Sequence, residues 1–89
     1  VLMDVSLDDY TKDIIFDLTR THKEIKNCYN LYSAPVGNKY LVVFTIAVDG
    51  NMSTYESHKL ANHLEKDIEA IDKIEKVVIH VHPENLNKI

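Results

Sequence analysis

The sequence is poor in cysteine and in positive charge, and it has no long apolar run. Its single cysteine, Cys28, excludes a disulfide within the chain and suits a reducing compartment. Ten lysines and arginines stand against 14 acidic residues, for a net charge of −4, and no basic stripe is present. This balance argues against a nucleic acid partner. No apolar segment approaches the ~18 residues of a membrane span, so the composition predicts an ordinary folded domain.

The length bounds what the chain can bury. Eighty-nine residues are enough for one domain with one modest core. A domain of this size buries only roughly 60–65% of its unfolded surface, so an oligomeric partner would add useful stability. Because the first residue is Val1, we expect the sequence to be a piece of a longer protein.

The segment "SLDDYTKDIIFDLTRTHKEI" has the spacing of a helix. Ser6 is the predicted N-cap, with Asp9 three residues later as a variant of the capping box. Apolar residues recur at helical spacing, which predicts a buried stripe made of Leu7, Tyr10, Ile14 and Leu18.

Two strands are expected next, separated by a turn. "NCYNLYS" is a short strand candidate, and "APVGN" has turn chemistry through Pro35 and Gly37. "KYLVVFTIAVD" is the strongest strand, and it is apolar on both faces, which predicts that both faces are covered. Two helices in a chain of this length can cover only one face. A second subunit is therefore the predicted cover of the other face, with Leu41, Val43 and Thr45 at the dimer interface.

A second helix and a last strand complete the pattern. Ser53 and Glu56 form a capping box at the start of "STYESHKLANHLEKDIEAI". The core stripe of this helix is predicted to be Leu60, Ala61, Leu64, Ile68 and Ile71. The strand "IEKVVIHVHP" is expected to stop at Pro83, with His80 and His82 on the face opposite Val77, Ile79 and Val81.

The predicted fold class is α+β, in the order α-β-β-α-β. It is a sandwich with two helices on one face of a three-stranded mixed sheet. Residues 6–83 are expected to form the domain and residues 84–89 a C-terminal tail.

Three stretches, "LMDVSLDD", "YLVVFTIAVDGNMSTYESHKLANHLEKDI" and "VVIHVHPEN", together resemble the cytosolic C-terminal domain of cation diffusion facilitator transporters. The resemblance covers Val1 to about Asn85, and it implies a ferredoxin-like, metallochaperone-like domain that dimerises on the cytoplasmic side of a multi-pass membrane protein. It also implies that six membrane helices precede Val1, that residues 1–5 form the junction with them, and that Asp4 lies at this junction. A solvated residue before a helix is the alternative interpretation of Asp4.

Some members of that family bind zinc in this domain, near the dimer interface. Carried over by position, the resemblance implies His58, His80 and His82 as metal ligands. Two further family ligand positions fall on Tyr29 and Thr45, which are not usual zinc ligands. The resemblance therefore implies a reduced site for Zn²⁺ or another divalent cation, and the alternative is surface or interface histidines without metal.

The remaining candidates have simpler explanations. His22 is expected to complement a helix C-terminus, although Glu24 and Cys28 follow within reach of a metal. Asp49 is a weaker metal candidate because it flanks a turn, and His63 is expected on a solvated flank. No base is paired with the cysteine, so no catalysis is expected.

The sequence thus predicts a dimeric, metal-sensing regulatory domain of a divalent cation efflux transporter, with zinc as the favoured cation. One alternative is a small-molecule regulatory domain of the ACT type, which usually starts with a strand rather than a helix. A second is a soluble metallochaperone, which normally carries a cysteine pair that this chain lacks.

Overall fold

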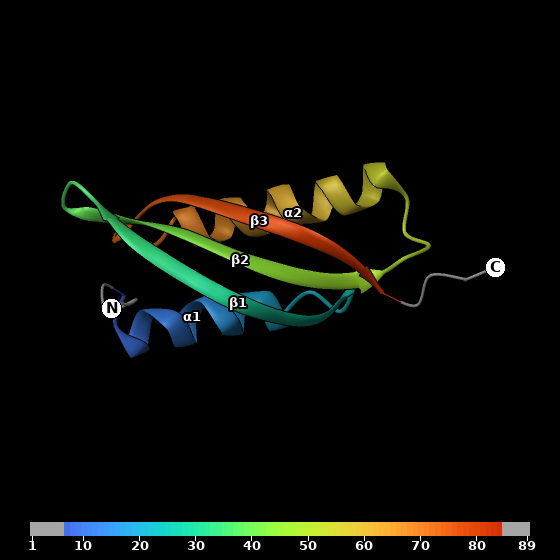
Figure 1. Ribbon diagram of the computed structural model, residues 1–89, viewed down its shortest axis with the longest axis horizontal. Coiled ribbons are helices and arrows are strands. Elements are labelled where there is room, and N and C mark those ends of the chain that lie inside the picture. Colours follow the sequence, from blue (N-terminus) through green and yellow to red (C-terminus); the bar gives the residue numbers. More distant parts are fainter. Residues whose placement is uncertain (1–6, 85–89) are drawn as a thin grey trace.

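The fold was described from a computed structural model, which defines residues 7–84. The elements are α1 (Asp9–Arg20), β1 (Ile25–Val36), β2 (Lys39–Asp49), α2 (Thr54–Glu69) and β3 (Ile74–Glu84). Their order confirms the predicted α+β class and the α-β-β-α-β sequence of elements (Figure 1). Within the described residues, no helix is long and apolar enough to cross a membrane.

The three strands form one mixed sheet in the order β1-β2-β3. β1 and β2 pair antiparallel through a short turn at Gly37, whose φ of 61° suits glycine. β2 and β3 pair parallel, and α2 provides the crossover between them. Because β2 is central, its neighbours in the register determine which side chains meet across the sheet.

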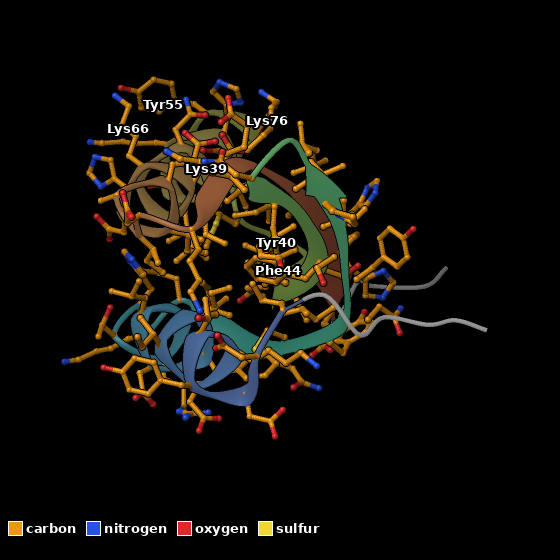
Figure 2. The ribbon with its side chains drawn as sticks, turned by 90° about the vertical axis from the view of Figure 1, so that its left-hand side faces the viewer. Lys39, Tyr40, Phe44, Tyr55, Lys66 and Lys76 are labelled. Carbon is orange, nitrogen blue, oxygen red and sulfur yellow. The ribbon has the colours of Figure 1, made fainter. Side chains whose placement is uncertain are left out.

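Both helices lie on the concave face of the curved sheet, and the labelled Tyr40 and Phe44 point into the space between helices and sheet (Figure 2). The core is built around β2, where Val42, Phe44 and Ile46 are fully buried. Ile15 of α1 and Leu64 of α2 reach the same core. No helix of residues 7–84 covers the opposite face of the sheet.

The predicted start of the first helix was wrong, and its predicted stripe is confirmed only in part, because Leu7 is buried and Leu18 packs against the core but the helix is rotated away from Tyr10. The N-cap is Asp8, whose Oδ1 accepts a hydrogen bond from the Thr11 backbone N–H at 2.7 Å; Ser6 lies outside the described residues. Tyr10 is 76% exposed, and the buried positions of α1 are Thr11, Ile15 and Thr19. Threonine was counted as polar in the pattern, but the Thr19 hydroxyl donates to the Ile15 carbonyl at 2.8 Å and can therefore be buried.

The first strand is longer than predicted and is interrupted. It runs from Ile25 to Val36, so Pro35 belongs to the strand rather than to the turn. Proline is tolerated there because β1 is an edge strand. The register shifts between Tyr29 and Tyr32, and Asn30 there adopts a positive φ of 58°, as expected for a β-bulge.

The second helix follows the prediction closely. Ser53 is its N-cap, and the Ser53 Oγ accepts a hydrogen bond from the Glu56 backbone N–H at 3.0 Å. Ala61, Leu64 and Ile68 are its buried residues. β3 continues one residue past Pro83, to Glu84, which is possible because β3 is the other edge of the sheet.

An ion pair joins the start of α1 to the connection between α2 and β3. The second carboxylate oxygen of Asp8 pairs with Lys73 Nζ. This pair, followed by the hydrogen bond from Thr11, holds the pKa of Asp8 far below the usual carboxyl range. The same pair raises the pKa of Lys73.

We expect Ser53→Ala to lower the free energy of unfolding by about 0.5–2 kcal/mol, because the Glu56 N–H loses its acceptor. Urea titration measures the difference. Ser57→Ala is the matched control: the Ser57 hydroxyl bonds only the Thr54 carbonyl inside the same helix, so its loss should change stability little. Equal effects of the two substitutions would mean that Ser53 does not stabilise the helix start.

We expect Asp8→Asn to destabilise the fold at pH 7, with the difference from wild type shrinking as the pH falls below about 4. The pKa of Asp8 is lowered in the folded state, so its stabilisation is present above the ordinary carboxyl pKa and is lost on acidification. Asparagine can still cap a helix, so the substitution isolates the charge. Denaturant titration at several pH values, with Asp13→Asn as a control for net charge, checks this. A difference that does not depend on pH would contradict it.

Candidate functional site

The open face of the sheet presents side chains in rows that run across all three strands. β2 contributes Leu41, Val43 and Thr45, which alternate with its buried core residues. In the register, Val43 lies between Tyr32 of β1 and Val78 of β3. Tyr32 is 56% exposed and Val78 is 36% exposed. These three residues form an apolar row that no other part of residues 7–84 covers.

A second row lies directly beside the apolar row. Tyr29 pairs with Thr45, and Thr45 pairs with His80, so the three side chains stand next to one another across the sheet. The resemblance assigned metal ligands to these same three positions, and the register brings the positions together. Only His80 carries a usual ligand atom for zinc. The bulge at Asn30 separates this row from the apolar row on β1 and so fixes which β1 residue faces Thr45.

His82 belongs to the following row, where it pairs with Ala47, and both histidines of β3 are exposed. His58 lies on α2, which covers the concave face, and it is also exposed. Within residues 7–84, no three histidine, cysteine or acidic side chains are grouped closely enough to hold a metal ion. The three principal candidates therefore supply suitable donors without forming a complete site in one chain.

His22 has a different environment from these exposed histidines. It follows α1, and its side chain is 20% exposed. Its Nε2 is buried and has no hydrogen-bond partner among the described residues. The nearest acidic atom is Oδ2 of Asp67, at 3.7 Å, on α2. His22 and Glu24 line one cleft, together with His63.

The other weaker metal candidates, Cys28 and Asp49, do not line the cleft that contains His22. Cys28 points to the concave side, opposite Ile46, and lines a separate cleft with Arg20. Partial burial raises the pKa of the Cys28 thiol, which disfavours the thiolate that metals bind. Asp49 ends β2, and its Oδ1 accepts a hydrogen bond from the Asn51 N–H at 2.8 Å, as in a turn. Asp4 lies outside the described residues.

Three residues were missed by the sequence reasoning. Tyr32 and Val78 complete the apolar row, but the bulge hid the phase of β1 and only the strand pairing shows that they flank Val43. Asp67 approaches His22 although the two are far apart in the chain. Its spacing of four residues from His63 on one helix was the available signal.

Residues 7–84 match the family described as "Cation efflux protein, cytoplasmic domain". A search of curated proteins gave no significant match. Among solved structures, the metal-bound C-terminal domain of the CzcD transporter from Thermotoga maritima has a TM-score of 0.81 and 29% identity, covering 92% of this chain and 100% of that one.

Two further structures support the same grouping. The cytosolic domain of a cation diffusion facilitator family protein has a TM-score of 0.79 and 31% identity, covering 86% of this chain and 93% of that one. CzrB in its Zn form has a TM-score of 0.77 and 26% identity, covering 98% of this chain and 100% of that one. An α+β domain of this topology is thus a known cytoplasmic module of cation efflux proteins. The chain belongs to the cytoplasmic-domain family of cation efflux proteins.

Proposed function

We propose that this chain is the dimerising, metal-sensing domain of a divalent cation efflux transporter and that zinc is its favoured ion. The observation that carries the proposal is the adjacency of two rows on the open face. The apolar row around Val43 lies beside the row that ends in His80. A surface that covers the first row must also approach the second.

A second copy of the chain is the proposed cover. Burial of a valine side chain contributes about 1.5–3 kcal/mol, so pairing of two such faces provides a substantial driving force. Leu41, Val43 and Thr45 lie at the centre of this interface, with Tyr32 and Val78 at their sides. A homodimer also supplies the additional burial that a domain of this size benefits from.

The metal site proposed at this interface uses His80, His82 and His58. Neutral imidazole is a good zinc ligand, and zinc favours about four donors in a tetrahedron. His80 and His82 project from one strand face, and His58 lies on a helix that starts at the same end of the sheet. Residues 7–84 of one chain do not bring three metal-ligand side chains together. Association of two chains is therefore proposed to supply the missing ligands. The CzcD domain is metal-bound and the CzrB structure is a Zn form, which supports metal binding by a domain of this family.

The proposed mechanism is regulatory rather than catalytic. A metal ion that contacts both subunits favours one relative orientation of the two domains. By linkage, that preference biases whatever is attached to them. We propose that this domain lies on the cytoplasmic side of the membrane and follows a transmembrane domain in the sequence. Residues 1–5, including Asp4, are proposed to form the junction between the two domains. Because Glu84 belongs to β3, the proposed C-terminal tail is reduced to residues 85–89.

We expect sedimentation at tens of micromolar to give about twice the monomer mass. Val43→Glu should shift the chain toward monomer, because burial of an unpaired carboxylate costs several kcal/mol. Tyr55→Glu is the matched control: Tyr55 is 74% exposed on α2 and points away from the sheet (Figure 2). A wild-type monomer under these conditions, with and without zinc, would contradict the proposed dimer.

We expect zinc to raise the stability of the wild type, by about 2.7 kcal/mol at a free concentration ~100 times Kd. His80→Ala and His58→Ala should each reduce this gain, and the gain should shrink below about pH 6 as imidazoles become protonated. Thermal unfolding with and without zinc measures it, and the zinc-free stability of each variant controls for folding. Equal gains in wild type and both variants would place the site elsewhere.

A further inference from the structure

A cleft between the end of α1 and the face of α2 that carries Glu56 and His63 is lined by several side chains of metal-ligand type. Its volume is about 380 Å³, and it lies on the helical side of the domain, away from the open face. Its lining combines two imidazoles, two carboxylates, one ammonium group and two apolar side chains, and the residues are His22, Glu24, Met52, Glu56, Lys59, Leu60 and His63.

The buried nitrogen of His22 is the unusual feature of this cleft. A buried polar atom without a hydrogen-bond partner or metal ion is energetically unfavourable. Binding of a ligand to Nε2 of His22 would therefore remove this cost. The Asp67 Oδ2 at 3.7 Å is too distant for a hydrogen bond. Two ligands of a tetrahedral zinc ion, each ~2.0–2.1 Å from the metal, lie about 3.3–3.4 Å apart. The observed spacing is thus within a few tenths of an ångström of what one shared ion requires.

α2 provides a third ligand beside this pair. His63 and Asp67 are four residues apart, so they project from the same face of the helix. This is the spacing at which a helix presents two ligands to one metal ion. His63 is exposed and lines the same cleft as His22, so its ring can turn toward Asp67 without disturbing the core. The three groups do not form a finished site as they stand, and a finished site would require this rotation of the His63 side chain.

The charges around the cleft also favour a cation. Glu24 and Glu56 line it, and Asp67 borders His22, whereas Lys59 is the one positive side chain in the lining. Imidazole and carboxylate together suit zinc and the neighbouring divalent transition metals. Cys28 takes no part, because it lines the other cleft.

We propose that His22, His63 and Asp67 form a second divalent-metal site, with Glu24 or water as the fourth ligand. The site links the end of α1 to the C-terminal half of α2. The Asp8–Lys73 pair ties the start of α1 to the segment after α2, so a bound ion would leave α1 tied at both of its ends. The site is contained in one chain and does not require the dimer.

Calorimetric titration of the 89-residue chain with zinc chloride at pH 7.5 tests the proposal. It is performed in a His80→Ala/His82→Ala background, so that the open-face histidines contribute nothing. One equivalent of zinc per chain should still bind. His63→Gln and Asp67→Asn should each weaken this binding by roughly tenfold or more, as expected for loss of a ligand. Glu65→Gln, a carboxylate of the same helix outside the cleft lining, is the matched control and should bind as the background does.

The side chain of Asp67 is 51% exposed and His63 is exposed, so neither substitution should threaten folding. Titration with Co²⁺ in place of zinc should give the visible absorption of a tetrahedral ion, and this signal should be lost in Asp67→Asn. Zinc binding that is insensitive to both substitutions would overturn the proposal. An absence of zinc binding in the His80→Ala/His82→Ala background would also overturn the proposal. If the wild type still bound zinc in that case, only the open-face site would be supported. Binding by neither protein would reject both sites.

Discussion

The structure depends on a single constraint, which is that β2 is central in the sheet and apolar on both of its faces. The concave face of β2 buries Val42, Phe44 and Ile46, and this requires both helices of residues 7–84. That part of the chain has no further helix to cover Leu41 and Val43 on the other face. The same strand that builds the core therefore also creates the surface on which association is proposed.

The position of β2 also determines the chemistry of the open face. The strand pairs antiparallel on one side and parallel on the other, so every row across the sheet is set by the register. Thr45 stands between Tyr29 and His80 because of the bulge at Asn30. Without the bulge, Tyr29 and its neighbours would present the opposite side chains, because a shift of one residue reverses the faces of a strand. A small irregularity in an edge strand thus decides what lies beside the histidine.

Local patterns predicted the elements that strong local signals define. The alternation of β2, the cap at Ser53 and the apolar stripe of α2 are all read from neighbouring residues, and all are confirmed. The predicted stripe of α1 was rotated because a hydrophobicity pattern counts threonine as polar. Thr19 is nevertheless buried, since its hydroxyl donates a hydrogen bond to a carbonyl of the same helix. The family positions of the open-face site came from resemblance, and only strand pairing showed that they adjoin. The approach of His22 to Asp67 depends on tertiary packing, which no local pattern encodes.

The two proposed metal sites differ in what their occupancy would report. A site at His80 responds to association, because its donors are incomplete in one chain, whereas a site at His22 responds to the packing of the two helices. The central claim is that a second copy covers the apolar row beside the histidines. Isotope-filtered NMR on a mixture of labelled and unlabelled chains tests it most directly. The account predicts intermolecular contacts from the methyl groups of Val43 and Val78 to the partner chain. A dimer whose intermolecular contacts all arise from other surfaces would contradict it.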